Sequence, residues 1–406
     1  MRNIGNFAAF AALAIGISTS ALAQDIAVRG GQVHTMAGEA ITDGVVVIED
    51  GKISAVGPAA STPIPDGMQV LEAAVITPGL VDARTVVGLA GFLNQPHDQD
   101  QLDESKPLQP QLRAIDGYNP EERLVEWLRG LGVTTIHTGH GPGALVSGQT
   151  MIAKTAGETA DEAAIVPGAM LAANLGPWAL ESGGKSPGTR SKQIAMLRSA
   201  MLAAKSGADE GDDDDKDAKP ASLEKQVLQS VLAGDMPLMV TAQRSQDIMS
   251  ALRLKEEFGI DLVIDGGAES YLLIDELRAA GVRVILHPTM ARQYGDLQNA
   301  SFTTAAKLRE AGIPFALQSG YESYVPKTRV VLWEAAIAAA NGLAWQHALA
   351  SVTIDAANLI GVGDRVGSLE VGKDGDIALF DGDPFEYTSH VTSVIIDGEV
   401  VSDTAM

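Results

Sequence analysis

The chain contains 406 residues, of which 46% are hydrophobic, and it has no cysteine. These features exclude disulfides, thiolate metal sites and a cysteine nucleophile, and they leave room for one large α/β domain with a smaller second domain. A formal net charge of −23 repels nucleic acid and anionic lipid, so neither is expected as a partner.

The N-terminus has the layout of a secretory signal peptide. Arg2 precedes the apolar run FAAFAALAIGI, and Ala21-Leu22-Ala23 forms a small-residue cleavage motif. We therefore expect residues 1–23 to be removed and the mature protein to be periplasmic. The apolar run is too short to span a bilayer, and no later stretch approaches the roughly 20 apolar residues of a transmembrane helix, so membrane insertion is not expected.

Both ends of the remaining chain are rich in predicted β-strands. DIAVRGGQVHTM and GVVVIEDGKISAVG follow the signal peptide, and DGDIALFDGDP and VTSVIIDGEVV lie near the C-terminus. The dipeptides Asp50-Gly51 and Asp397-Gly398 are typical of two-residue hairpin turns. Because neither end has enough strands for a stable sheet alone, we predict that residues 24–74 and 362–406 form one discontinuous β-sandwich.

Strands and helices alternate between these ends, most clearly from residue 236 to residue 320, which predicts a parallel sheet covered by helices. Asn119 and Pro120 are expected to begin one of the helices, and GVTTIHTGHG follows as a strand. Residues 207–222 interrupt the pattern, because they are acidic and have no large apolar side chain. We predict a solvated surface loop there, since the carboxylates lack the spacing of an EF-hand calcium site.

Four stretches, GVVVIEDGKISAVG, ITPGLVDA, GVTTIHTGHG and DRVGSLEVGKDGDIALFDGDP, resemble the amidohydrolase superfamily, particularly its imidazolonepropionase-like members. The resemblance implies a distorted (β/α)8 TIM-like barrel over residues 75–361, flanked by the β-sandwich, with chemistry at the C-terminal ends of the strands. It also implies a hydrolase of non-peptide C–N bonds in cyclic amides or small amide substrates, often assembled as a homo-oligomer.

The resemblance further implies a metal centre held by His-x-His after strand one, a carboxylated lysine, histidines after strands five and six, and an aspartate after strand eight. VPGAMLAANLG has no lysine, and the other positions fall on non-ligating or altered residues. These residues are Arg84, Val86, Thr241, Gly266 with its neighbour Asp265, and Gly320. A metal lowers the pKa of its bound water from about 15.7 to about 7, whereas a general base contributes about 10²–10⁴-fold, so the family mechanism and a bound cofactor are not expected.

Arg84 has two alternative roles. In the first, its guanidinium supplies the permanent positive charge that a metal ion provides in the family. It is then able to clamp a carboxylate or phosphate bidentately. Alternatively, it is a structural residue paired with Asp82 or Asp265. The other ligand-binding candidates are Thr241 and Arg244 in MPLMVTAQRSQDI, and His97 and Asp98 in NQPHDQDQLDES.

The candidate catalytic residues lie at predicted strand ends: His137, His140, Asp265 and His287. They form either a metal-free acid–base site or, with Asp98 or Asp100, a relocated divalent-metal site. His137 and His140 are three positions apart, so a regular strand points them to opposite faces unless it bends at Gly139. Two functions stay open: an exported hydrolase with a rebuilt site, and a catalytically inactive barrel that binds a small anionic ligand or a protein partner in the periplasm.

Overall fold

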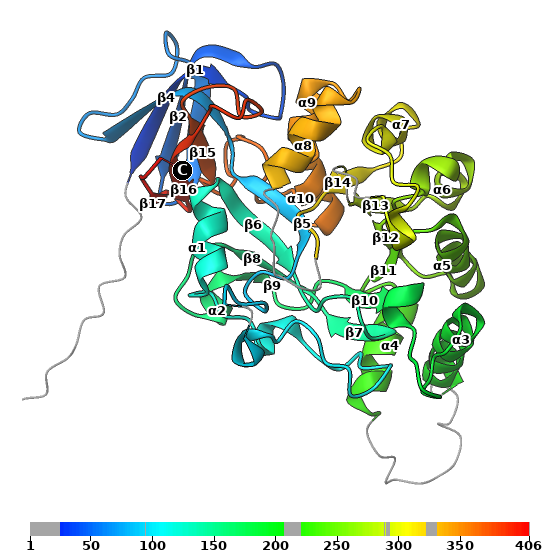
Figure 1. Cartoon of the computed structure of the whole chain (residues 1–406). Coiled ribbons are helices and arrows are strands. Elements are labelled where there is room, and N and C mark those ends of the chain that lie inside the picture. Colours follow the sequence, from blue (N-terminus) through cyan, green and yellow to red (C-terminus); the bar gives the residue numbers. More distant parts are fainter. Residues whose placement is uncertain are drawn as a thin grey trace, which may run out of the picture.

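The computed structural model describes residues 25–93, 95–206, 221–287, 289, 293–321 and 331–405. The predicted signal peptide lies outside these residues, and so do residues 207–220 of the predicted acidic loop. Within the described part of the chain, a β-sheet built from both chain ends lies beside a larger α/β unit (Figure 1). None of the helices formed by these residues is long and apolar enough to cross a bilayer.

Strands from both ends of the chain form one seven-stranded sheet in the order β17-β16-β15-β4-β1-β2-β3. β15 pairs antiparallel with β4, with Ile377 opposite Pro78, so this pair joins the two ends. Both predicted hairpin turns are confirmed, because Asp50, Gly51, Asp397 and Gly398 all have positive φ. The strands are β1 (Ile26–Val33), β2 (Ile41–Glu49), β3 (Lys52–Pro58), β4 (Gln69–Pro78), β15 (Ile377–Phe380), β16 (Val391–Ile396) and β17 (Glu399–Ser402).

The remaining strands lie in two further sheets, which the described residues do not close into one continuous hydrogen-bonded ladder. One sheet has the order β14-β13-β12-β11-β10-β7 and is parallel from β10 to β14, and the other has the order β5-β6-β8-β9. The Gly320 N–H, just after β14, donates to the Arg84 carbonyl of β5 at 3.2 Å. The strands are β5 (Leu80–Thr85), β6 (Val133–Thr138), β7 (Val146–Gln149), β8 (Met151–Lys154), β9 (Ala164–Val166), β10 (Leu171–Asn174), β11 (Leu238–Ala242), β12 (Leu262–Gly266), β13 (Arg283–Leu286) and β14 (Phe315–Leu317).

Helices follow the strands along the chain and cover the outside of the parallel sheet (Figure 1). The α-helices are α1 (Arg123–Gly130), α2 (Ala160–Ala163), α3 (Arg190–Ser206), α4 (Leu223–Ala233), α5 (Ser245–Phe258), α6 (Ile274–Ala280), α7 (Thr304–Glu310), α8 (Val331–Ala340), α9 (Trp345–Ala350) and α10 (Ile354–Ile360). Short 3-10 helices occupy Pro96–Asp98, Ala114–Asp116, Pro177–Ala179, Ser270–Leu272 and Gly295–Leu297.

The predicted start of the first helix was wrong. Helix α1 begins at Arg123, and the Glu122 carboxylate caps it by accepting from the Leu124 N–H at 2.6 Å. Asn119 instead accepts from the Glu121 N–H at 3.1 Å in the preceding turn. Since Asn119 and Glu122 are both able to cap, the choice depends on which start buries the apolar face of the helix, and sequence alone does not give that.

Strand alternation sets which side chains share the inner face of the parallel sheet. Met239, Val263 and Ile285 belong to one buried cluster, which also contains α10 residues. Residues two positions further along each strand point to the same face. This rule brings Thr241, Asp265 and His287 together at the carboxyl ends of β11, β12 and β13.

An ion network around Lys154 connects the seven-stranded terminal sheet to the larger α/β unit, which is called the barrel below. The ammonium of Lys154, at the end of β8, lies 2.8 Å from an Asp374 oxygen and 3.0 Å from an Asp376 oxygen, and it also pairs with Asp397 in the β16–β17 turn. Burial alone lowers the pKa of Lys154, but the three carboxylates raise it above its usual value. The barrel and the terminal sheet therefore share one set of buried charges.

Candidate functional site

A network of buried hydrogen bonds links the ends of the inner-face strands. The Asp265 carboxylate accepts from the Thr241 hydroxyl at 2.6 Å and from the Gln318 amide at 2.6 Å. Gln318 also donates to the Ile285 carbonyl at 2.9 Å. Asp265 is only 7% exposed, so its charge is offset mainly by these donors and by nearby cations.

Arg84 provides the cation of this region. Its side chain is buried, and its terminal nitrogens donate to the carbonyls of Thr85 and His140 and, at 3.3 Å, to that of Gly139. Its Nε is buried without a hydrogen-bond partner. Among the described residues the guanidinium forms no direct ion pair, although the field of Asp265 and then Asp82 opposes the lowering of the Arg84 pKa by burial.

Asp82 connects β5 to the end of β14. One carboxylate oxygen accepts from the Arg84 N–H at 3.2 Å and from the Ser319 N–H at 3.0 Å, and the other oxygen has no partner. Burial raises the pKa of Asp82 to about 7, while the hydrogen bonds from Ser319 and Arg84 act in the opposite direction. The Ser319 hydroxyl also donates to Thr85 at 3.1 Å, so polar contacts bridge the two sheets at this point.

Gly266 and Gly320 have no room for a side chain. Their φ angles are +84° and +75°, which favour glycine. A Cβ at Gly266 would lie 2.3 Å from the Gln243 amide nitrogen, and a Cβ at Gly320 would lie 2.6 Å from the His287 ring. The His287 ring therefore occupies the space beside β14, and its Nδ1 lies 3.3 Å from the Gln318 carbonyl.

His137 has two protein partners and is fully buried. Its Nδ1 lies 2.8 Å from the Ala83 carbonyl, and its Nε2 lies 2.6 Å from the Thr150 hydroxyl. These contacts fix a neutral tautomer that donates from Nδ1. Burial and the Arg84 charge lower the His137 pKa to about 3. The geometry favours a structural role for His137 over the predicted catalytic one.

His140 lies two residues after the end of β6. It is buried, both ring nitrogens lack a hydrogen-bond partner, and its ring lies against Gly148. Burial and then Arg84 lower the His140 pKa to about 4, against the opposing charges of Asp103 and Asp100. The structure therefore does not bring His137 and His140 together with a carboxylate as an acid–base group.

Three of the predicted ligand-binding residues lie outside the Arg84 network. His97 and Asp98 form the exposed 3-10 turn after β5, where Asp98 accepts from the Gln95 N–H at 2.7 Å. Arg244 precedes α5 and pairs with Glu269 at 3.5 Å. In the part of the chain that the structure describes, no group of three His, Cys, Asp or Glu residues is arranged to hold a metal ion.

Sequence reasoning missed Gln318, Ser319 and Thr85 as members of the site. Gln318 lies two positions after the buried inner-face residue Ala316, so strand alternation supplied a usable signal for it. The bonds of Ser319 to Asp82 and Thr85 join residues more than 200 positions apart, and no local pattern indicates them.

Comparisons with known proteins decide the family. The profile of the amidohydrolase family matches residues 241–402. The imidazolonepropionase of Rhizorhabdus wittichii is 26% identical over 388 residues, covering 87% of this chain and 92% of that protein. The crystal structure of an amidohydrolase from Thermotoga maritima has a TM-score of 0.86 and 26% identity, covering 93% of this chain and 100% of that one. The chain belongs to the amidohydrolase superfamily.

The predicted fold class, an α/β TIM-like barrel with a small β-domain, is thereby confirmed for this amidohydrolase. A more distant structure, an adenosine deaminase from Xanthomonas campestris with bound zinc, has a TM-score of 0.56 at 17% identity and shows the fold alone. Membership also confirms the coarse functional class predicted from the sequence, a family of hydrolases that act on C–N bonds.

The packing around Gly320 predicts that any side chain at this position lowers the free energy of unfolding by several kcal/mol. Gly320→Ala combines left-handed strain, about 1–2 kcal/mol, with overlap of the His287 ring, about 1–3 kcal/mol more. Gly234→Ala is the matched control, because Gly234 has a φ angle of +83° but no atom lies close to the position that an added Cβ would occupy. Urea unfolding should show Gly320→Ala as the more destabilised variant, and adding His287→Ala should recover part of the difference. Equal losses for the two glycines would contradict the packing argument.

The neutral His137 predicts a specific pH dependence of stability. Its pKa is about 3 in the folded protein and 6.5 as its reference value, so between these pH values the unfolded chain binds a proton that the folded chain does not. The free energy of unfolding therefore falls as pH is lowered through this window. Between pH 7 and pH 5, the wild type should lose about 2 kcal/mol more than His137→Gln in urea titrations. Identical losses would show that His137 titrates normally.

Proposed function

We propose that this amidohydrolase is a metal-independent member of its superfamily, which binds a small anionic amide at the barrel mouth without hydrolysing it through a metal-bound water. The observation that carries the proposal is the buried Arg84 guanidinium, which is held by three main-chain carbonyls at the chain position of the first family metal ligand. A fixed cation of this kind attracts a carboxylate and repels a divalent ion.

The residues at the other family ligand positions do not fit a divalent metal. Val86 has no donor atom, and Gly266 and Gly320 neither have a side chain nor have space for one. Thr241 and Asp265 carry oxygen atoms, but they are already bonded to each other and, through Asp265, to Gln318. Three hydrogen-bonded oxygens beside a permanent cation do not form a zinc or iron site.

The contacts of Arg84 restrict how it binds an anion. Three of its five N–H groups donate to main-chain carbonyls, which leaves the Nε N–H and one Nη2 N–H for the bidentate clamp predicted from the sequence. The carbonyls hold the guanidinium in place, which lowers the entropy cost of binding. The charge of Arg84, without a direct ion pair among the described residues, supplies the attraction.

A second candidate function is slow, metal-free hydrolysis of the bound C–N bond. Family membership and the position of His287 beside Gln318 and Gly320 favour it. A single general base contributes about 10²–10⁴-fold, which is far below the effect of a metal-activated water. We therefore expect ligand binding to exceed turnover as the measurable activity.

A measurement of bound metal distinguishes both candidate functions, ligand binding and metal-free hydrolysis, from the metal-dependent mechanism of the family. The mature protein, purified without a metal-chelating tag, should contain far less than one zinc, iron or manganese ion per chain by mass spectrometry. Hydantoins, lactams and dipeptides with a carboxylate should raise its melting temperature equally with and without added zinc, whereas their uncharged analogues should not. Near-stoichiometric metal that is required for turnover would overturn the proposal.

Arg84 variants test the cation directly. Arg84→Ala leaves three buried carbonyls without their donor and two buried carboxylates without their nearest cation, so it should lower the free energy of unfolding by about 3–5 kcal/mol. Arg113→Ala is the control, because its 3.9 Å pair with Asp116 is exposed and should contribute less than about 1 kcal/mol. Arg84→Lys keeps the charge, so it should retain more affinity for the carboxylate ligands than Arg84→Met does. If both variants bind these ligands as the wild type does, Arg84 is purely structural.

A further inference from the structure

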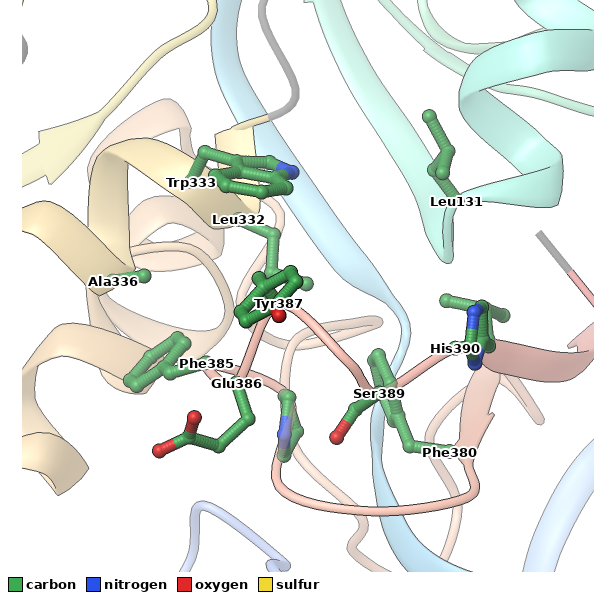
Figure 2. Close-up of a pocket in the computed structure, with 12 residues that line it drawn as sticks. Leu131, Leu332, Trp333, Ala336, Phe380, Phe385, Glu386, Tyr387, Ser389 and His390 are labelled. Atoms are coloured by element: carbon green, nitrogen blue, oxygen red, sulfur yellow. The ribbon is translucent and has the colours of Figure 1, made fainter.

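A pocket lies outside the Arg84 network, between helix α8 and the segment that connects β15 to β16 (Figure 2). It has a volume of about 200 Å³, and Leu131, which lies between α1 and β6, forms part of its wall. None of the residues that line it takes part in the Arg84, Asp82 or Asp265 contacts. The pocket is therefore independent of the proposed barrel-mouth function.

Aromatic side chains are concentrated in this pocket. Aromatic residues make up only 4% of the chain, yet Trp333, Phe380, Phe385 and Tyr387 all line this one cavity. Trp333 is 50% exposed and Tyr387 is 80% exposed, so two large rings are left in contact with solvent. Figure 2 shows these two rings near each other on one side of the cavity, with His390 and Leu131 on the other side. Such exposed rings are typical of a binding surface.

The aromatic segment is held in a fixed conformation. The Asp383 carboxylate accepts from the Phe385 N–H at 2.9 Å and from the Trp345 indole at 3.1 Å. The Trp345 ring packs on the Phe385 ring with their centroids 5.2 Å apart. Because the segment is ordered by the protein itself, little further ordering is needed when a ligand binds.

The charge of the lining favours a cation. Among the described lining residues Glu386 is the acidic one, and no described Lys or Arg forms an ion pair with it. His390 belongs to an ion pair with Asp381 at 3.1 Å, so its charge is balanced when it is protonated. No Lys or Arg among the described residues lines the cavity, and the chain as a whole carries a formal charge of −23. Aromatic faces beside a carboxylate attract organic cations.

We propose that this pocket binds a small organic cation with a methylated ammonium head group. The head group contacts the Trp333 and Tyr387 rings, and Glu386 at the rim adds long-range attraction. A volume of about 200 Å³ is below the range usual for drug-sized ligands, so it suits a compact head group with any longer substituent extending into solvent.

Choline and its uncharged isostere 3,3-dimethyl-1-butanol provide a matched pair of probes, since they differ in the charge of the head group and hardly in shape. Titration calorimetry on the full mature chain should give an affinity for choline at least about tenfold higher than for the isostere, as expected for two ring contacts. Higher salt should weaken choline binding and leave the isostere unchanged. Equal affinities, or no saturable binding of choline at millimolar concentrations, would overturn the proposal.

Two variants locate the site. Trp333→Leu should lower the choline affinity at least about tenfold, and it should fold normally because Trp333 is half exposed on the first turn of α8. Trp178→Leu is the matched control, since Trp178 is 40% exposed but does not line the pocket. It should leave the affinity unchanged. Glu386→Gln should lower the affinity by a smaller, salt-dependent factor. If Trp333→Leu and Trp178→Leu bind choline equally well, the cation does not bind in this pocket.

Discussion

The burial of a guanidinium at the end of β5 is the constraint on which the rest of the barrel mouth depends. A permanent charge removed from water needs acceptors in contact and opposite charge nearby. The carbonyls of residues 85, 139 and 140 provide the acceptors, and Asp82 and Asp265 provide the charge. Each carboxylate then needs donors of its own, which explains the bonds from Ser319, Thr241 and Gln318.

The same network fills the strand ends around Arg84. In a metal site, the side chains converge on one cation from several strands. Here the cation is attached to β5 itself. The end positions of strands β12 and β14 are glycines in left-handed conformations, and the neighbouring Gln243 and His287 side chains occupy the space. A side chain introduced at either glycine therefore meets an occupied site.

The sequence predicted those features that depend on local patterns. The two Asp-Gly hairpins follow from turn chemistry, and the parallel run from β11 to β14 follows from the alternation of strands and helices. Tertiary contacts decided the remaining features. Helix α1 begins four residues after Asn119, because Glu122 is the residue that caps it. The role of His137 is set by the Ala83 carbonyl and the Thr150 hydroxyl, and the positions of these groups around the ring depend on how three strands pack.

The Lys154 network affects how this protein unfolds. Its ammonium is carried by the barrel, while its three carboxylates come from the last 33 residues of the chain. Separating the two units leaves an uncompensated charge on each exposed face, in addition to uncovered apolar surface. The two units are therefore expected to melt in a single transition.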